Sequence, residues 1–245
     1  KNEEQLDDNE AVSAINCAFV GFGGGGGKLA KAFLDLGFNK TLLINTTAKD
    51  QPADLDSKHL VIVPDADGVA KNIEFGKEVL SRNSAFVEDV DWLFVLAGGG
   101  GGTGSACSVL HGTFERYLSS VGGTGKVFYI MTWPSAQESL NHTIVKNAFS
   151  LSNDIAEYPH IVLSNERQLG FLRGKVGIAN MFPTANTAFA KLFHQILKLS
   201  SEQSSIQTFD SKDLERCLKT PKRTFIGATL IQNAKSPNLG SEIFQ

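Results

Sequence analysis

Two runs of glycine constrain most strongly what this chain can fold into. The first covers residues 23–27, with Gly21 two residues before it, and the second covers residues 98–102, with Gly104 just beyond. Each run follows a short apolar segment and precedes an amphipathic one, which indicates a strand, a loop and a helix. Glycine lets backbone amides approach an anion without an intervening β-carbon, and the following helix presents its positive end. The two runs therefore predict phosphate-binding loops at the edge of a sheet.

The rest of the chain alternates in the same way. Strands are expected at residues 17–21, 41–45, 60–63, 92–97, 127–132 and 160–164. Helices are expected at residues 28–36, 73–82, 103–119 and 135–153, followed by a long central helix at about 184–199. This order is typical of an α/β fold with a parallel sheet and helices on both faces.

The last part of the chain predicts a loop at residues 200–208, a short helix at 211–218 and a strand at 224–231. A strand that begins so late needs partners, and few residues follow it. We therefore expect a second domain that is incomplete in this chain.

The first glycine loop fits two common nucleotide motifs poorly. A P-loop requires Ser or Thr after its lysine to reach magnesium, but Leu29 follows Lys28 here. A Gly-x-Gly-x-x-Gly pattern starts at Gly21, yet the second strand ends in Asn45-Thr46-Thr47, without the carboxylate that binds a dinucleotide ribose. A dinucleotide-dependent oxidoreductase is therefore disfavoured.

The second glycine loop has no counterpart in a dinucleotide fold. Thr103 and Ser105 add hydroxyl donors where the backbone amides of a helix start are unpaired. Two such loops suit one triphosphate held from two sides. The alternative, two flexible turns without a ligand, is disfavoured because every glycine in a turn loses conformational entropy on folding.

Composition excludes several other classes of protein. The chain has 23 Lys and Arg against 26 Asp and Glu, without the basic stripe that nucleic-acid binding requires. Its apolar runs are far shorter than the roughly 20 residues of a membrane span, and its first residues are polar and acidic. Cys17, Cys107 and Cys217 have no metal-ligand spacing and are expected to serve packing. A soluble cytoplasmic protein that binds neither nucleic acid nor membrane is expected.

The ordered motifs resemble those of the tubulin/FtsZ superfamily of GTP-dependent filament proteins. The second loop is similar to the family signature Gly-Gly-Gly-Thr-Gly-Ser, and the first to the glycine loop of the FtsZ branch. Asn45-Thr46 resembles the Asn-Thr after the second strand, residues 68–76 follow the loop that faces the terminal phosphate, and Thr132-Trp133-Pro134 resembles the Thr-x-Pro loop. The series extends over residues 17–231.

The resemblance implies a site for GTP or GDP with Mg²⁺. Glu138 would meet the ribose, Asn165 and Asn186 the guanine, and Phe182 would pack on the base. The other residues implied in binding are Gly23, Gly24, Gly25, Lys28, Gly68, Lys71, Asn72, Gly100, Gly101, Gly102, Thr103, Gly104, Ser105, Pro134 and His142. No side chain is expected to ligate the metal, so phosphate oxygens and water would hold it.

Asp210 and Asp213 are the candidate catalytic residues. They stand three apart at the start of the predicted short helix, where they share a face, and carboxylates can polarise an attacking water. Taken alone, the pair is interpreted more simply as a helix cap and a solvated side chain. Its place in the series instead matches the family's loop that reaches into the next subunit. The implied protein is a GTPase that assembles head to tail with itself, and any adaptor or cargo protein is unidentified.

Some positions depart from the family pattern. Ala70 and Lys71 replace glycines, Lys28 replaces a common Asn, His142 a common Arg, and Thr208 a common Asn. The changes at Ala70, Lys71, Lys28 and His142 are expected to alter the response to nucleotide, and Thr208 affects the expected rate of hydrolysis more than binding. They leave open a guanine-nucleotide-binding structural assembly that does not hydrolyse.

On this interpretation the chain is a divergent FtsZ/TubZ-like protein in four parts. They are a polar arm at residues 1–14, a GTP-binding domain at 15–180, the central helix at 181–200, and the catalytic loop with the start of a second domain at 201–245.

Overall fold

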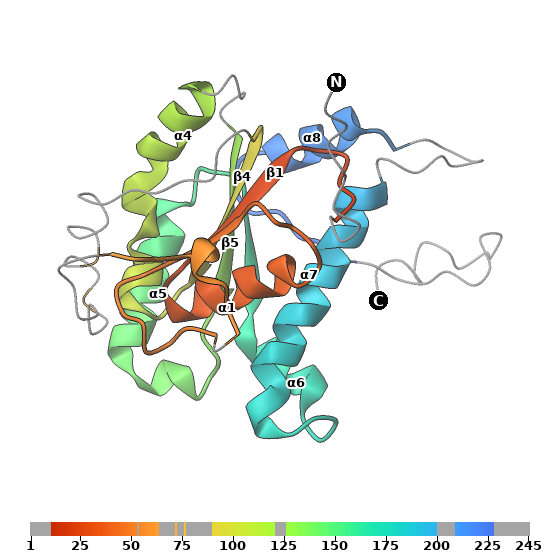
Figure 1. Ribbon diagram of the computed structural model, residues 1–245. Helices are drawn as coiled ribbons and strands as arrows, with labels where there is room; N and C mark the ends of the chain where they lie inside the picture. Colours follow the sequence, from red (N-terminus) through yellow and green to blue (C-terminus); the bar gives the residue numbers. More distant parts are fainter. Residues whose placement is uncertain are drawn as a thin grey trace.

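A six-stranded sheet forms the centre of the molecule (Figure 1). The computed structural model describes residues 11–52, 54–63, 72, 76, 90–120, 126–199 and 209–227. The strands are β1 (Cys17–Phe22), β2 (Thr41–Asn45), β3 (Leu60–Ile62), β4 (Trp92–Gly98), β5 (Lys126–Trp133) and β6 (His160–Ser164). They are all parallel and lie in the order β3-β2-β1-β4-β5-β6. The predicted parallel α/β sheet is confirmed, with strand ends within a residue of the expected bounds.

Helices cover both faces of this sheet (Figure 1). They are α1 (Gly23–Leu34), α3 (Gly102–Ser105), α4 (His111–Ser120), α5 (His142–Asp154), α6 (Asn165–Leu172), α7 (Met181–Leu199) and α8 (Ser211–Lys219). Short 3₁₀ turns lie at Ser57–His59, Cys107–Leu110, Glu138–Leu140 and Ile178–Asn180. Within the described residues, no helix combines the length and the apolar character needed to cross a membrane.

The alternation of side chains along β1 builds two separate cores. Phe19 points to the face covered by α1, α7 and α8, where its ring stacks on Phe33 with centroids 4.0 Å apart. Phe193 of α7 closes this aromatic cluster. The neighbouring residue Val20 points to the opposite face, which α4 and α5 cover. Successive residues of a strand face opposite sides, so a strand buried on both faces is apolar throughout.

Several helix boundaries differ from the predicted ones. Helix α1 begins at Gly23, five residues before the predicted start, because its glycines pack against the sheet. The predicted helix at residues 103–119 is broken into α3, a 3₁₀ turn and α4. The predicted helix at 135–153 begins only at His142, where the Asn141 side chain caps it by accepting from the Thr143 N–H. Helix α6, capped by Ser164, was not predicted.

The long central helix is present as α7, which starts at Met181 and packs on α1. The predicted strand at 224–231 is not formed in its described part. Only Arg223 makes a parallel bridge, to His160, and residues 224–227 are irregular. Residues 228–231, the predicted helix at 73–82 apart from Gly76, and the predicted loop at 200–208 lie outside the described residues.

Candidate functional site

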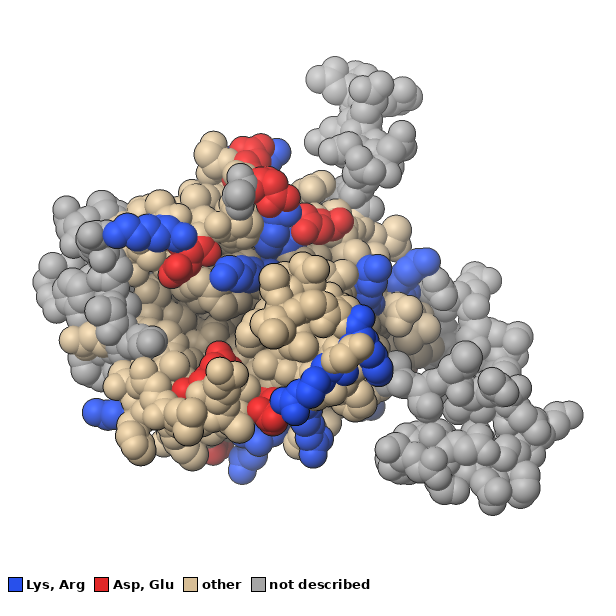
Figure 2. Space-filling view, turned by 90° about the horizontal axis from the view of Figure 1, so that it is seen from below, with Lys and Arg blue, Asp and Glu red and all other residues tan. Residues whose placement is uncertain are grey.

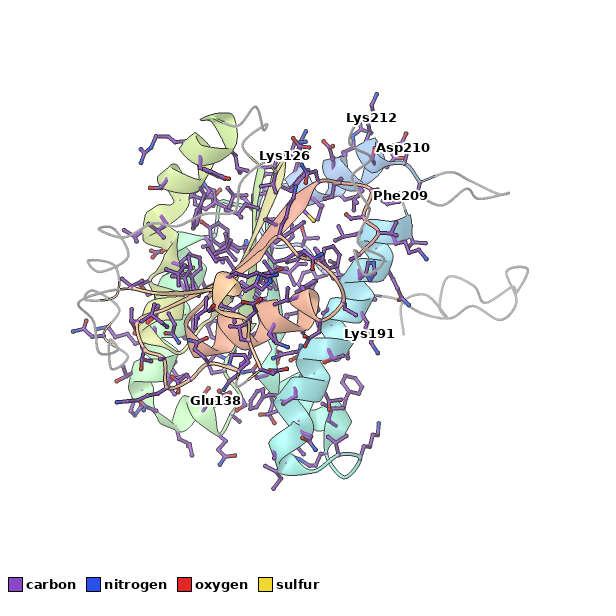
Figure 3. The ribbon with its side chains drawn as sticks, in the orientation of Figure 1. Lys126, Glu138, Lys191, Phe209, Asp210 and Lys212 are labelled. Atoms are coloured by element: carbon purple, nitrogen blue, oxygen red, sulfur yellow. The ribbon has the colours of Figure 1, made fainter. Side chains whose placement is uncertain are left out.

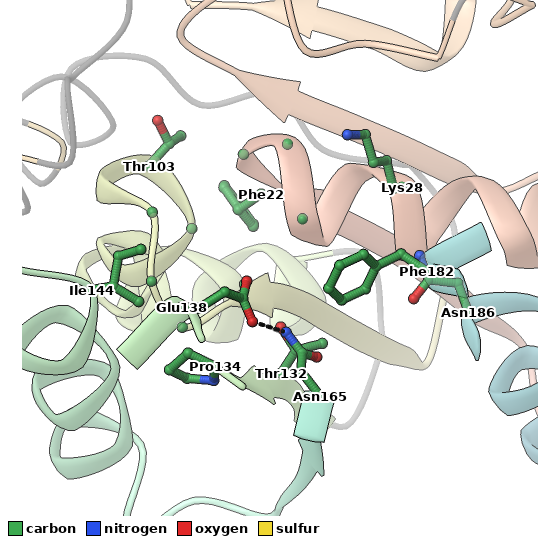
Figure 4. Close-up of a pocket in the computed structure, with 18 residues that line it drawn as sticks. Phe22, Lys28, Thr103, Thr132, Pro134, Glu138, Ile144, Asn165, Phe182 and Asn186 are labelled. Carbon is green, nitrogen blue, oxygen red and sulfur yellow. Dashed lines mark hydrogen bonds between the residues drawn. The ribbon is translucent and has the colours of Figure 1, made fainter. Parts of the chain in front are cut away.

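A cavity of about 360 Å³ opens at the carboxyl ends of the strands (Figure 4). Parallel sheets place their loops together at this edge, where ligands commonly bind. Both glycine loops, the turn after β5, the start of α6 and the start of α7 contribute to its wall. The lining residues are Phe22, Gly23, Gly24, Gly25, Lys28, Gly98, Gly99, Gly100, Gly101, Thr103, Gly104, Thr132, Pro134, Glu138, Ile144, Asn165, Phe182 and Asn186.

Two helix starts face this cavity without side-chain caps. Neither Phe22, before α1, nor Gly101, before α3, caps its helix through a side-chain hydrogen bond. No acidic residue lies in the first turn of either helix. The first amides of a helix have no partner within it, and at the twelve-residue α1 they add to the positive end of the helix dipole. This wall of the cavity therefore suits an anion.

The two glycine loops also touch each other. A β-carbon built on Gly23 would lie 3.0 Å from the backbone nitrogen of Gly104, and Gly23 has φ +68°. A β-carbon on Gly25 would lie 3.3 Å from Cα of Gly98. The close approach of the two backbones, together with the left-handed φ at Gly23, requires glycine there. The loops thus form one continuous backbone cradle.

The opposite wall is polar. Glu138 Oε2 accepts hydrogen bonds from the backbone N–H of Ser135 at 2.7 Å and from Nδ2 of Asn165 at 3.1 Å. Asn165 is the first residue of α6 and is buried. These two donors fix the Glu138 carboxylate at the cavity wall, as Figure 4 shows for the bond from Asn165. A fixed carboxylate of this kind can accept from a ligand hydroxyl.

The start of α7 supplies an apolar surface beside an amide. Phe182 is 39% exposed, and Asn186 follows it one turn later on the same helix. Both line the cavity across from Pro134 (Figure 4). Lys28 of α1 also reaches this end. Among the lining residues, Lys28 is the one cation and Glu138 the one carboxylate.

Not every residue predicted for binding lines the cavity. Gly102 and Ser105 are buried and absent from its lining, whereas His142 and Asn72 are exposed elsewhere. Gly68 and Lys71 lie outside the described residues. The role of each predicted residue in binding stays a prediction.

Sequence reasoning missed some of the lining. Thr132 belongs to the Thr-x-Pro motif and Phe22 lies within the first glycine loop, but neither is among the predicted binding residues, and Ile144 gives no signal in the sequence. Ile144 reaches the cavity from α5, and a β-carbon on Gly100 would come within 2.6 Å of its Cγ2. An ordinary apolar helix residue can be recognised as a cavity residue only once the helix is placed.

The end of β2 shows why a dinucleotide is disfavoured. The strand order alone is compatible with a dinucleotide fold. However, Thr46 is buried where such a fold places a carboxylate, and its Oγ1 lies 2.8 Å from Oγ1 of Thr103. This hydroxyl pair ties the end of β2 to the second glycine loop.

Asp210 and Asp213 are exposed at the other end of the molecule from Glu138, as Figure 3 shows for Asp210. Asp210 caps α8, its Oδ1 accepting from the N–H groups of Lys212 at 2.8 Å and Asp213 at 2.9 Å. Asp213 Oδ2 accepts in return from the Asp210 N–H at 3.4 Å. The pair is thus a capping box, and neither residue lines the cavity of its own chain.

Two of the three cysteines are packing residues, as expected. Burial raises the pKa of the Cys17 thiol to about 12 and moves the pKa of Cys107 well above its usual value. Cys217 is exposed on α8, so the expectation of a packing role is wrong for it. In the described part of the chain, no group of three or more His, Cys, Asp or Glu side chains is placed to hold a metal ion.

A band of Lys and Arg side chains lies on the side of α6 and α7 in the view from below (Figure 2). The exposed basic residues of these helices and their connection are Arg167, Arg173, Lys175, Lys191 and Lys198. They are spread along the sequence, so they formed no visible stripe there. Five cations are fewer than the about six to ten phosphate contacts of many DNA-binding proteins.

Solved structures match this chain in fold, although no family model and no curated protein sequence matches it. One is TubZ of Clostridium botulinum phage c-st, 20% identical, with a TM-score of 0.62 over 84% of this chain and 67% of that chain. Another is a GTPγS-form protofilament of TubZ from Bacillus thuringiensis serovar israelensis, 18% identical, with a TM-score of 0.67 over 86% and 64%. An empty FtsZ dimer of M. jannaschii is 20% identical, with a TM-score of 0.60 over 90% and 63%.

The chain shares the fold of these TubZ and FtsZ structures. This confirms the expected fold class. The chain spans 60–67% of the length of the TubZ, CetZ and FtsZ chains that it matches. In this tubulin/FtsZ fold, the cavity at the strand ends combines an anion cradle, a fixed carboxylate, an aromatic ring and two amides.

Proposed function

We propose that this chain is a GTP-binding, self-assembling GTPase of the tubulin/FtsZ type that forms head-to-tail filaments. One observation supports the proposal most: two uncapped glycine loops, Glu138, Asn165, Phe182 and Asn186 all line one cavity. The TubZ structure matched in fold is a GTPγS-form protofilament, which supports both the ligand and self-association.

The cavity would accommodate the parts of a guanine nucleotide in order. The backbone amides at the starts of α1 and α3 would bind the phosphates, and Glu138 would accept from a ribose hydroxyl. Phe182 would stack on the base, while the amides of Asn165 and Asn186 offer a donor and an acceptor to its edge. Mg²⁺ would neutralise phosphate charge and be held mainly by phosphate oxygens and water.

Hydrolysis would be completed between subunits. Helix α7 has 19 residues and rises about 1.5 Å per residue, so its ends are separated by more than about 25 Å. Asn186 lies near its start, and Asp210 follows beyond its end. The Asp pair therefore does not serve the cavity of its own chain. In a head-to-tail stack, it faces the phosphates of the neighbour.

A second candidate keeps guanine nucleotide as a structural ligand without turnover. The capping box favours it, because both carboxylates already hold the start of α8. Residues used for capping need no catalytic role to explain their position.

Both candidate functions require a bound guanine nucleotide, and the nucleotide recovered from purified protein tests this. We expect GTP or GDP, with ATP competing poorly, because a site built to pair with guanine leaves its amides unpaired against adenine. Asn186→Ala should reduce the preference for GTP over ATP, whereas Thr187→Ala, one residue along on the exposed surface of α7, should not. Equal affinity of the wild type for both nucleotides would contradict the proposed base site.

Phosphate release measured against protein concentration separates turnover from static binding. Specific activity should collapse below the assembly concentration, because the site is shared. Asp210→Ser retains a good capping side chain but removes the carboxylate, so it should bind GTP and lose turnover. Constant activity per subunit where sedimentation shows only monomers would exclude the shared site. Assembly with bound nucleotide but without phosphate release would favour the structural role.

A further inference from the structure

The α8 end of the molecule presents cations beside the Asp pair. Lys212 stands between Asp210 and Asp213 in the first turn of α8, and Arg216 follows one turn later. Both basic residues are exposed. Figure 3 shows Lys212 and Asp210 together at this end, far from Glu138. Any neighbour that meets Asp210 and Asp213 therefore also meets Lys212.

Lys212 has no ion-pair partner within the described residues. Glu215 is the nearest carboxylate on the following turn, but its Oε2 lies 2.6 Å from Nζ of Lys126 and 3.4 Å from Nζ of Lys219. The backbone N–H of Lys212 donates to Asp210 Oδ1, which fixes the backbone of this turn while leaving the ammonium group available. The backbone of Lys212 is therefore fixed, while its ammonium group forms no ion pair with the described residues.

The proposed shared site needs such a charge. Among the side chains that line the cavity, the positive charge of Lys28 and the negative charge of Glu138 cancel. A triphosphate brings several negative charges, and the Asp pair of a neighbour would add two more. Backbone amides supply only partial charges at the phosphates. Mg²⁺ on the phosphate oxygens would offset part of this charge, but without a further cation the negative charge that remains would still repel the incoming carboxylates.

We propose that Lys212 is a catalytic residue that acts across the subunit boundary on the terminal phosphate of the neighbour's nucleotide. This inference rests on the proposed head-to-tail GTPase. The oxygen of a water molecule forms a bond to the terminal phosphorus, and the bond from that phosphorus to the bridging oxygen breaks. Its electron pair stays on the diphosphate. A water proton passes to the Asp pair, and Lys212 remains protonated while it neutralises charge on the transferred group, as cations do in other phosphoryl transfers.

The test compares Lys212→Met with Lys212→Arg and with Lys191→Met, a change at an exposed lysine of α7 outside the site. At concentrations above assembly, Lys212→Met should lower phosphate release per subunit at least about tenfold. Lys212→Arg should retain most of it, and Lys191→Met all of it. GTP binding, measured separately, should be unchanged in all three, because the nucleotide cavity belongs to the other face. Urea melts should coincide, since the Lys212 side chain makes no hydrogen bond with the residues that the structure describes.

A mixing experiment tests action across the boundary. Lys212→Met subunits should bind nucleotide normally but supply no lysine to the neighbouring subunit. Gly101→Val subunits should bind nucleotide weakly but supply Lys212 to the neighbouring subunit normally. Their mixture should release phosphate faster than either variant alone.

The outcomes separate this inference from the proposed function. Wild-type activity of Lys212→Met, with turnover lost in Asp210→Ser, would overturn the role of Lys212 and leave the shared GTPase site standing. Absence of phosphate release by assembled wild-type protein would overturn both. Failure of the mixture to recover activity, although sedimentation shows co-assembly, would overturn action across the boundary.

Discussion

The two glycine loops look alike in sequence but differ in what requires glycine. In the first loop, a β-carbon on Gly21 would lie 2.4 Å from the carbonyl oxygen of Gly26, and one on Gly26 would lie 2.3 Å from that of Leu96. In the second loop, a β-carbon on Gly101 would meet none of the described residues within 4 Å. The backbone of Gly101, with φ −82° and ψ 154°, suits any residue. Packing thus explains Gly21 and Gly26, whereas the described residues give no packing reason for glycine at Gly101, where we propose the close approach of a ligand.

The second loop is not uniform in this respect. A β-carbon on Gly104 would lie 2.7 Å from the carbonyl oxygen of Gly98. A bulky residue there would disturb the fold as well as the phosphate cradle. Gly101 is therefore the cleaner position at which to test ligand binding.

Gly26→Ala should have the largest effect. The new methyl group would collide with the carbonyl of Leu96, so α1 must move away from the sheet. We expect a loss of about 3 kcal/mol or more in the free energy of unfolding, measured by urea denaturation. Gly112→Ala is the control, because Gly112 lies on α4 with no other described residue within 4 Å of an added β-carbon, so the change should be neutral or slightly stabilising. Equal stability of the two variants would show that the first loop adapts to a side chain.

Gly101→Val should weaken nucleotide binding without affecting the fold. We expect GTP affinity to fall about tenfold to a hundredfold, which corresponds to about 1.4 to 2.8 kcal/mol. Gly177→Val is a matched control, since Gly177 also precedes a short helix, has extended backbone angles and would bring a β-carbon within 4 Å of no other residue in the described part of the chain. Calorimetric titration with GTP measures the difference, and thermal melts without nucleotide should agree for both variants. Unchanged affinity in Gly101→Val would remove the ligand as the reason for this glycine.

Thr103→Val tests the hydrogen bond by which Thr103 ties the second loop to Thr46. The change keeps the shape of the side chain but leaves the buried hydroxyl of Thr46 without its partner at Thr103. We expect a loss of about 1 kcal/mol in unfolding free energy. The double variant Thr46→Val with Thr103→Val should recover part of this loss in a double-mutant cycle. Additive losses in that cycle would mean that the two hydroxyls do not depend on each other.

The smallest effect should be a dependence of folding stability on pH, on the side of the sheet that carries the second glycine loop. His111 begins α4, and burial lowers its pKa from the ordinary value of 6.5. As the pH falls, the unfolded chain therefore takes up a proton at His111 before the folded chain does. The contribution of His111 to folding stability is complete above about pH 6.5 and is lost below it. Urea melts from pH 8 to pH 5 should show stability falling faster in the wild type than in His111→Gln. Parallel profiles would contradict the shift.

How far the sequence predicts this fold depends on the kind of element. The buried strands were found almost to the residue, because a strand covered on both faces is a short apolar run that hardly depends on its neighbours. Helix ends were less predictable. Glycine-rich residues 23–27 are poor helix formers, yet they begin α1 because only glycine fits between that helix and the carbonyl of Leu96. The late strand at 224–231 failed in its described part for the related reason that pairing requires a partner, and β6 offers one bridge.

The candidate site was predictable where residues belong to local motifs. The glycine loops, Glu138, Asn165, Phe182 and Asn186 were named from the sequence and line one cavity. Ile144 was not named, because its contribution depends on where α5 lies. Ser105 was expected beside the ligand, but it is buried beneath the loop and outside the cavity lining, since a one-residue step along a helix turns a side chain by about 100°.

The sequence by itself determined the parallel α/β architecture and the position of two anion-binding loops, because both depend on short-range patterns of apolar residues and glycine. Tertiary structure decided which of those glycines the fold itself requires, through contacts between residues as distant as Gly26 and Leu96. It also placed Asp210 at the opposite end of the molecule from Glu138. Spacing along a chain does not reveal such a separation, because the length and direction of α7 set it.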